Sequence, residues 1–484
     1  MATISSLGVG SNLDLNSLLA NIKTSAQAPL IALQQQQRSY TSRLSAYGQL
    51  SSALSALQTA AAALAKSTLF QGMKASSTAT DVLTATALST AAVGSYAVNV
   101  TQLAQAQSLA AAGVTSTTTA IGGGAATTVT LDFGTISGGT LDPATGKYTG
   151  ATFTADTTRA ATSITIDASN NTLAGIRDAI NGSATMGVTA SIVNDGSATP
   201  NRLVLTSKLT GETSSMRIAV TGDAALSGML ANDPAATQNL QQTAVAQNAN
   251  LTVNGIAVTS ATNTVAGAIQ DVTMTVAKVG ASTLAVQNDS ASVESAITAF
   301  VTAYNSLQSV ANQLTAFDAT KKSGAILMGD STLRNIQVRI RTTLNTAQVP
   351  DSSGLAMLSQ IGVSFQKDGT LAIDSAKLTT ALGSQLSGVA NLFSGTAGSG
   401  GYGAQMSSLI TGFTDTTNGS LTVATKGVNT TLTSLGKQYS ATSDRIDATI
   451  ARYKAQFTQL DGLMSSMNQT SSYLAQQFKT TSTN

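Results

Sequence analysis

Apolar side chains recur at alternating steps of four and three residues from Val428 to Phe478. This 3.5-residue period keeps one narrow apolar stripe on one side of a helix, as in a coiled coil. A helix of about fifty residues would be roughly 75 Å long at 1.5 Å per residue. The seam comprises Val428, Leu432, Leu435, Tyr439, Thr442, Ile446, Ile450, Tyr453, Phe457, Leu460, Met464, Met467, Ser471, Leu474 and Phe478. We therefore expect a long C-terminal helix whose stripe needs a partner.

The N-terminal end carries a similar but less regular seam. Its members are Leu15, Leu19, Ile22, Leu33, Tyr40, Leu44, Tyr47, Leu54, Leu57, Ala61 and Leu64. The two ends can satisfy each other's stripes in a helical hairpin within one chain, or they can pack on other chains. The pattern leaves both arrangements open: packing on other chains predicts an assembling part, whereas a hairpin within one chain needs no partner.

Near residue 75 the helical period gives way to alternating Thr, Val and Gly. The Asn254–Gly255 pair between alternating residues is typical of a two-residue β-hairpin turn, and Asn171 or Thr172 can cap a short helix. We expect residues 263–265 to open a short turn toward Ile269. The predicted strands are 95–100, 163–167, 188–193, 202–207, 251–253, 256–258, 272–276 and 284–286. Residues 76–285 therefore read as a β-rich insertion.

Helical periodicity returns at Asp289 or Ser290, and a second helix is predicted from Asp330 to Leu344. A hairpin around 361–373 turns at Asp368–Gly369. The predicted fold class is multidomain α+β, with discontinuous helical coiled-coil legs formed by both termini and an inserted β-rich head. The predicted domains are a terminal coiled coil (1–40 and 437–484), a helical leg (41–75 and 286–436), an inner head (76–111 and 238–285) and an outer head (112–237).

Composition excludes several classes of function. The 484 residues contain no His, Cys or Trp, which removes the usual general acid–base group and the ligands of soft metals. We expect no enzyme and no cofactor. A net charge of +2 without an aromatic-interleaved basic stripe predicts no nucleic-acid binding. The apolar runs are too short for membrane insertion, and the first cation, Lys23, lies too far along for a cleaved signal peptide.

Three motifs suggest chemistry that their context does not support. The Gly8-Val9-Gly10 start of a dinucleotide fingerprint lacks its third Gly and a preceding strand, and Gly122–Gly124 lacks the Lys of a phosphate loop. Ser364 and Lys367 have the spacing of an acyl-transfer pair but fall in a predicted hairpin. We interpret all three as turns or flexible leads.

The one local accumulation of basic residues includes Arg334 and Arg341. They are seven residues apart and therefore share a helix face. A solvated helix face and an inter-subunit ion-pair surface both fit this pattern.

Short motifs through most of the chain resemble the bacterial flagellar filament cap family, also called hook-associated protein 2. They are SSLGVGSNLDL at 5–15, Pro29–Leu30, LSAYG at 44–48, GSY at 94–96, QLAQAQ at 102–107, GDSTLR at 329–334, residues 358–369, LFSG at 392–395, YKAQF at 453–457, and residues 460–461 and 464–478. Residues 162–221 and 250–287 also resemble the small β-rich repeats of flagellin-type proteins. In the second repeat Asp271 stands where that resemblance leads us to expect Gly.

The resemblance implies an extracellular protein at the distal filament tip, exported unfolded through the flagellar type III pathway without a cleaved signal peptide. It implies a homo-oligomeric ring of about four to six subunits. It further implies that the ring retains exported flagellin and promotes its folding and insertion. The implied partners are flagellin, hook–filament junction proteins and a cytosolic export chaperone. The alternatives are another axial protein, such as flagellin or a junction protein, or a surface protein that adheres to host mucin or glycans.

Two sets of residues follow as candidate sites. The expected oligomer or filament interface comprises Leu15, Leu19, Ile22, Leu33, Tyr40, Leu44, Tyr47, Ile446, Ile450, Tyr453, Arg334 and Arg341. The expected chaperone-binding stripe comprises Phe457, Leu460, Met464, Met467, Leu474 and Phe478.

Overall fold

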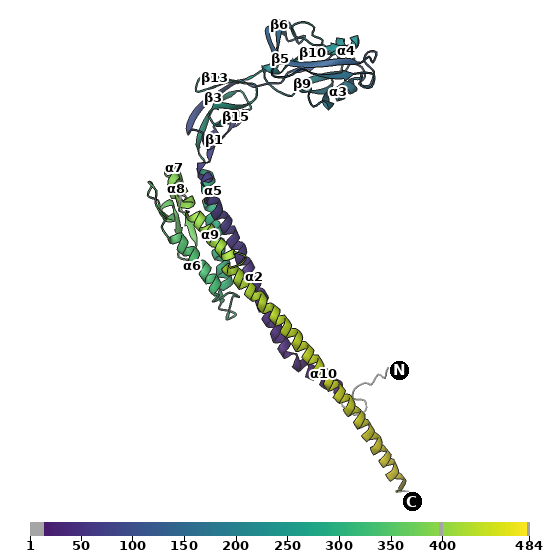
Figure 1. The fold of residues 1–484 in the computed structure, drawn as a ribbon, viewed down its shortest axis with the longest axis vertical. Helices are drawn as coiled ribbons and strands as arrows, with labels where there is room; N and C mark the ends of the chain where they lie inside the picture. The colour runs from purple at the N-terminus through teal and green to yellow at the C-terminus, as the bar shows by residue number, and fades with distance from the viewer. Residues whose placement is uncertain (1–13, 396–399, 482–484) are drawn as a thin grey trace. The chain divides into compact units, whose positions relative to one another are not determined.

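The computed structural model describes residues 14–395 and 400–481, with side chains as far as Gln477. The chain forms two compact units (Figure 1). The helical unit combines both ends of the chain, Met1–Phe70 and Ser290–Asn484, and the β-rich unit is the intervening segment, Gln71–Asp289. The predicted α+β class, with helical ends around a β-rich middle, is confirmed.

Long helices from the two ends of the chain dominate the helical unit. α1 (Leu15–Ala26) is capped by Asp14, whose side chain accepts a hydrogen bond from the Ser17 backbone N–H. α2 (Ala28–Leu64) follows after a break at Gln27, and Pro29 lies in its first turn, where its missing N–H is tolerated. The predicted N-terminal seam is thus carried by two helices. α10 (Ser420–Thr481) has 62 residues, which makes it roughly 93 Å long.

α2 and α10 run antiparallel. The Gln34 Nε2 donates a hydrogen bond to the Tyr439 hydroxyl at 3.2 Å, and Gln37 of the next turn lies opposite Gly436. Later positions of α2 therefore meet earlier positions of α10. Figure 1 shows the two helices side by side, and α1 also contacts α10.

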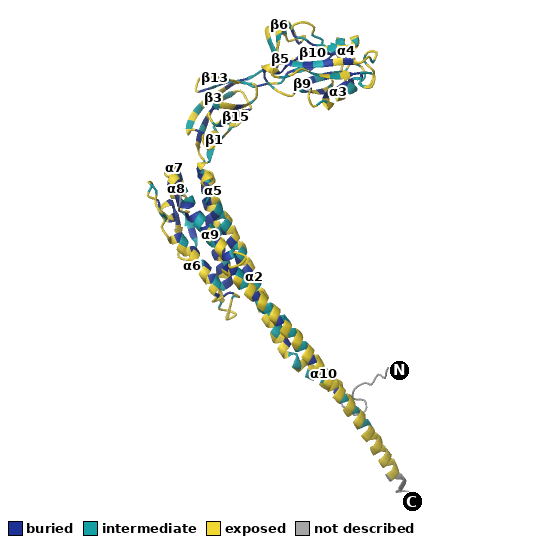
Figure 2. Ribbon diagram, in the orientation of Figure 1, coloured by how far each residue is buried: buried dark blue, intermediate teal, exposed yellow. Residues whose placement is uncertain are grey.

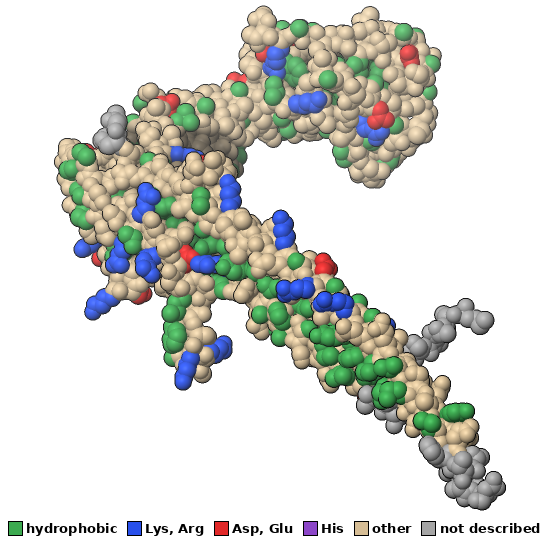
Figure 3. Space-filling model, turned by 60° about the horizontal axis from the view of Figure 1, so that its bottom comes forward, with side chains coloured by type: hydrophobic (Ala, Val, Ile, Leu, Met, Phe, Trp, Pro, Cys, Tyr) green, Lys and Arg blue, Asp and Glu red, His purple; other side chains and the backbone are tan. Residues whose placement is uncertain are grey.

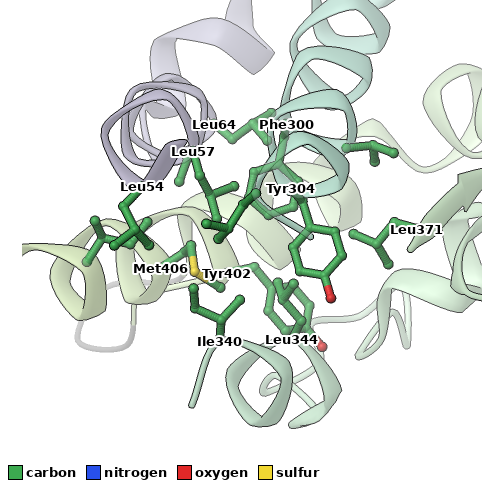
Figure 4. Close-up of a cluster of buried hydrophobic side chains, with 14 of the residues drawn as sticks. Leu54, Leu57, Leu64, Phe300, Tyr304, Ile340, Leu344, Leu371, Tyr402 and Met406 are labelled. Carbon is green, nitrogen blue, oxygen red and sulfur yellow. The ribbon is translucent and has the colours of Figure 1, made fainter. Parts of the chain in front are cut away.

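The remaining elements of the helical unit build a core on one end of α2. They are η1 (Ser67–Gln71), α5 (Ser290–Thr315), β17 (Phe317–Asp318), β18 (Ser323–Gly324), α6 (Ser331–Asn345), η3 (Leu358–Ile361), β19 (Val363–Phe365), β20 (Leu371–Ile373), α7 (Ser375–Ser384), α8 (Leu386–Ser394) and α9 (Tyr402–Thr414). Figure 4 shows Leu54, Leu57 and Leu64 of α2 facing Phe300 and Tyr304 of α5.

Close helix contact in this core depends on a small residue. A Cβ atom on Gly403 of α9 would lie 2.7 Å from the carbonyl oxygen of Ala61 in α2. Tyr402, next to it, is fully buried and donates its hydroxyl proton to the Thr346 carbonyl oxygen at 2.8 Å. Packing of this kind contributes most of the stability of helices in proteins.

The β-rich unit contains two apolar cores. Around the first core lie a five-stranded sheet in the order β1-β16-β3-β12-β13 and a three-stranded sheet in the order β14-β15-β2. The strands are β1 (Met73–Ser77), β2 (Leu83–Ala87), β3 (Gly94–Gln102), β12 (Ala249–Val253), β13 (Ile256–Ser260), β14 (Thr264–Ile269), β15 (Val272–Val276) and β16 (Gly280–Asn288). Alternate residues of these strands point into the core, as a half-buried sheet requires.

The second core lies between two four-stranded sheets and short helices. One sheet has the order β10-β5-β6, with β7 also paired to β5, and the other has the order β11-β4-β9-β8. The elements are β4 (Ser108–Ala110), β5 (Thr127–Asp142), β6 (Lys147–Ala155), β7 (Thr162–Ile166), α3 (Leu173–Gly182), β8 (Val188–Asn194), β9 (Asn201–Ser207), η2 (Glu212–Ser214), β10 (Ser215–Thr221), α4 (Ala224–Leu230) and β11 (Gln241–Ala244).

The structure corrects one local prediction and resolves another. Thr264 does not open a turn, because residues 264–269 form strand β14, paired with β15. Asp271 adopts φ +60°, the left-handed conformation that a glycine would take. Its carboxylate accepts a hydrogen bond from Thr90 Oγ1 at 2.7 Å, which holds the turn without glycine.

The domain divisions can be compared with the observed units. The units divide at Phe70/Gln71 and Asp289/Ser290, a few residues outside the expected insertion. Within the β-rich unit, β4 and β11 pair with each other, so the second core begins at Leu109 and reaches Leu240. The expected limits of the outer head, 112 and 237, lie inside that core. The division of the helical unit into a terminal coiled coil and a leg stays a prediction.

Candidate assembly surfaces

The first half of the α10 seam is covered by the chain itself. Val428, Leu435 and Ile446 are buried, and α10 contacts both α2 and α1 along this stretch. Leu15 of α1 and Tyr47 of α2 are buried as well. Of the expected interface residues, Leu15, Tyr47 and Ile446 are thus buried within one chain, and the contact of α2 with α10 is the hairpin arrangement that the pattern allowed.

Other expected interface residues of the N-terminal helices are only partly covered. Five are half-buried, namely Leu19, Ile22, Leu33, Tyr40 and Leu44. Two apolar residues outside the predicted seam, Leu18 and Ile31, are exposed. Leu18 of α1 and Ile31 of α2 lie beside the predicted seam, and a 3.5-residue period is too narrow to include them.

The second half of α10 presents an apolar face without cover among the described residues. Ile450, Phe457 and Met464 are half-buried, whereas Tyr453, Leu460, Met467 and Leu474 are exposed. The rings of Tyr453 and Phe457 stack at 6.3 Å between centroids. Figure 2 shows the change from buried to exposed residues along the helix. The side chain of Phe478 lies outside the described residues. We call Leu460, Leu463, Met464, Met467 and Leu474 the distal stripe.

Leu463 was missed by the heptad pattern and is 60% exposed. At about 100° per residue it lies within roughly 60° of Leu460, so it widens the distal stripe beyond a two-residue seam. Tyr473, also exposed, lies on the other side of the helix. The three-residue step from Leu460 to Leu463 in the sequence could have identified Leu463 as part of the same apolar face. On the face drawn in Figure 3, hydrophobic side chains gather along the long helices toward the C-terminal end of α10.

A second surface feature brings Arg334 and Arg341 together. Both line a hollow of about 330 Å³ with Lys367 and Asp368, and the amides of Gln308 and Gln337 are also in its wall. Among the ion pairs of the described residues, neither arginine has a carboxylate partner. The Arg341 guanidinium lies 5.6 Å from the ring centroid of Phe365, which holds it in place. The hollow is therefore a cationic recess suited to a carboxylate.

A buried network fixes α6, which carries both arginines. Asp330 caps α6 by accepting a hydrogen bond from the Leu333 N–H at 3.0 Å. Its other oxygen accepts hydrogen bonds from the Tyr47 hydroxyl at 2.6 Å and from Arg43 at 2.7 Å. Burial opposes ionisation of Asp330, but the bonds from Tyr47, the Leu333 N–H and Arg43 keep its pKa below the usual value. Burial, with the Asp330 hydrogen bond second, raises the pKa of Tyr47.

Metal-binding clusters and membrane-spanning helices are not found in the described part of the chain. No cluster of acidic side chains there could hold a metal ion. None of its helices combines the length and hydropathy needed to cross a bilayer. Within the helical unit, the distal stripe and the cationic recess are two described surfaces suited to a partner.

Family models match most of the chain. The model described as Flagellar hook-associated protein 2 C-terminus matches residues 246–469, and the corresponding N-terminus model matches residues 11–107. The Flagellin hook IN motif matches residues 147–208. Flagellar hook-associated protein 2 of Escherichia coli K12 is 41% identical, over 100% of this chain and 99% of that protein. The protein of that name from Salmonella typhimurium is 39% identical, over 99% of each chain.

A solved structure of a flagellar cap protein is similar to this chain. The flagellar cap protein FliD D1-D2-D3 domains from Escherichia coli align with a TM-score of 0.61 and 36% identity. The alignment covers 79% of this chain and 99% of that one.

Proposed function

Because this chain belongs to the flagellar hook-associated protein 2 family, we propose that it caps the distal end of a flagellar filament as a homo-oligomeric ring. The family is one of structural flagellar proteins and not of enzymes. In this proposal the ring retains exported flagellin and promotes its folding and insertion. The subunit number, about four to six, stays a prediction.

The distal stripe is the observation that supports assembly most directly. Leu460, Leu463 and Met467 lie on one face of α10 and are exposed in the part of the chain that the structure describes. An amphipathic helix with a bare apolar face is stabilised when that face is covered by another helix or a groove. A neighbouring subunit or the end of the filament would supply this cover in the assembled cap.

The cationic recess is proposed as a contact between subunits. Arg334 and Arg341 can pair with a carboxylate of the adjacent subunit, because neither forms an ion pair within the described chain and Asp368 is the one carboxylate beside three cations in the recess. Such an ion pair would fix the orientation of neighbouring subunits more than it would raise their binding affinity.

The remaining partners are proposed from the family alone. They are hook–filament junction proteins and a cytosolic export chaperone, which would cover the distal stripe before export through the type III pathway. The protein would then lie outside the cell at the filament tip, without a cleaved signal peptide. An adhesive role toward host mucin or glycans stays a prediction.

Charge placed in the distal stripe should prevent ring formation. We expect the double variant Leu460→Asp, Met464→Asp to remain monomeric where the natural chain forms closed rings, because two carboxylates would have to leave water in the contact. Mass photometry of the full chain gives the distribution of species. Calorimetry with the export chaperone should show at least about tenfold weaker binding, the equivalent of 1.4 kcal/mol.

The matched control is Thr458→Asp, Gln469→Asp on the opposite side of the same helix, where both residues are exposed. It should form rings and bind the chaperone like the natural chain. Equal behaviour of the two double variants would show that the stripe is not the contact. An open helical polymer from the natural chain would favour a flagellin-like axial role over a cap.

A further inference from the structure

Strand β13 lies at one end of the five-stranded sheet and has a neighbour on one side only, β12 (Figure 1). Ile256, its first residue, is 71% exposed, the highest value among the large exposed hydrophobic residues of the described chain. Ala257 and Thr259 are exposed as well. A sheet edge of this kind presents unpaired backbone groups to its surroundings.

The hairpin register identifies those groups. Asn254 and Gly255, at φ +49° and +82°, form a two-residue turn, and Val253 pairs with Ile256. In such a hairpin the pair next to the turn is hydrogen-bonded, and bonded and non-bonded pairs then alternate. Ile256 and Val258 therefore bond to β12, whereas Ala257 and Thr259 direct N–H and C=O away from the sheet.

The side chains of β13 add an apolar face to this free edge. Ile256 and Val258 lie opposite Val253 and Leu251, whose side chains are buried in the core. They project from that same face, because paired residues of a sheet share a face. The face of the five-stranded sheet that forms the core therefore extends onto β13. There the three-stranded sheet no longer covers it, and Ile256 is exposed to solvent.

Nothing in the sequence of β13 blocks pairing. Proteins protect exposed edges with Lys, Pro, bulges or inward charges. The opposite edge of the same sheet, β1, carries the exposed Lys74, but residues 256–260 contain neither a charge nor a proline.

We propose that β13 binds an extended polypeptide segment that has not yet folded, with apolar residues at alternate positions. The segment adds to the sheet as a further strand, bonds to Ala257 and Thr259, and places every second side chain against Ile256 and Val258. This inference rests on the proposed function, since a cap that promotes folding must hold an incoming chain before that chain is folded.

The size of the edge favours this occupant over a second copy of the chain. Five residues span about 17 Å at 3.4 Å per residue, so an added strand buries far less than the roughly 1,600 Å² of a stable complex. Two outward residues offer four hydrogen bonds, and each contributes little net free energy because it replaces a bond to water. Such a contact is weak and brief, which suits a segment that must leave again to complete its own fold.

Hydrogen exchange on the full chain tests the proposal, with a short peptide of alternating valine and threonine as the probe. We expect the amides of Ala257 and Thr259 to exchange about tenfold more slowly at saturating peptide. The amides of Ile256 and Val258, already bonded to β12, should change little. A peptide with proline at every second position should have no effect, because it cannot supply the donors.

Ala257→Pro removes one outward N–H without removing a bond to β12, and it should weaken peptide binding about tenfold. Ala257→Val keeps the N–H and is its control. Ile256→Lys, at a solvent-exposed position, provides a second test if the proline variant loses its fold. Equal binding by all variants, or no slowing at Ala257 and Thr259, would overturn the proposal.

The outcomes also separate this proposal from the proposed function. Rings that form while the peptide fails to bind would overturn the strand proposal alone. Peptide binding without rings in mass photometry would overturn the cap and leave the edge site standing. A concentration-dependent dimer of the full chain that Ile256→Lys abolishes would show a second copy on β13 and overturn the assignment to an unfolded segment.

Discussion

At the scale of single residues, the buried charge of Asp330 connects two helices. Asp330 is buried and joins α2 to α6 through Tyr47 and Arg43 while capping α6. A buried carboxylate is stable only with such partners, and removal of the charge leaves the donors around it unsatisfied. The position of the cationic recess depends on this network, because Arg334 follows one turn after Asp330.

Asp330→Asn should lower the stability of the helical unit by about 2 kcal/mol near neutral pH. The folded-state pKa of Asp330 is lowered, so its contribution is fully present above the unfolded pKa and is lost as the pH falls through the folded value. The difference between natural chain and variant should therefore be constant from pH 7 to about pH 5 and shrink below about pH 4.

Thermal unfolding followed by circular dichroism across this pH range measures the effect. The control is Asp318→Asn, which removes the exposed Lys321–Asp318 pair of the same unit and should leave the melting temperature almost unchanged. A difference for Asp330→Asn that grew toward acid pH would contradict the network described above.

At the scale of elements, α10 is one helix with two environments. Its first half buries Val428 and Leu435 against the rest of the helical unit, and its second half leaves Leu463 and Met467 in water. Helical propensity alone gives little stability, since most of it comes from a packed face. The same helix should therefore be stable at one end and open readily at the other.

Hydrogen exchange of dilute monomer should show this gradient. We expect amides between 421 and 446 to be protected and those between 460 and 477 to exchange at least about a hundredfold faster. In assembled rings the second group should become protected. Uniform protection along α10 in a verified monomer would mean that the distal stripe is already covered.

At the scale of the whole molecule, the chain is divided into two units with separate cores. The β-rich unit begins at Gln71 and ends at Asp289, and β1 pairs with β16 within a few residues of these two points. Both its chain ends therefore lie together, as expected of a domain inserted into another.

A fragment of residues 71–289 should consequently fold alone. It should give a strand-rich circular dichroism spectrum and a cooperative melting transition. The complementary chain, with 71–289 replaced by a short Gly–Ser linker, should be helical and keep the other transition. If neither fragment unfolds cooperatively, the two cores are not independent.

The sequence by itself determined the features that depend on near neighbours along the chain. Heptad spacing predicted the long helices, Thr172 caps α3 as one of the two expected residues, and the Asn254–Gly255 turn joins two strands as expected. These follow from backbone geometry and from capping bonds within three residues, so a short window of sequence contains their cause.

Tertiary structure decided the features that depend on distant residues. Asp330 lies 287 positions from Arg43, and the strand pairing that leaves β13 at an edge joins segments more than a hundred residues apart. Sequence periodicity predicted one continuous apolar seam on α10. Which part of that seam is buried depends on where α1 and α2 pack against α10. Such pairings are selected by the total burial of the fold, because each contact stabilises only when the others hold its partners in place.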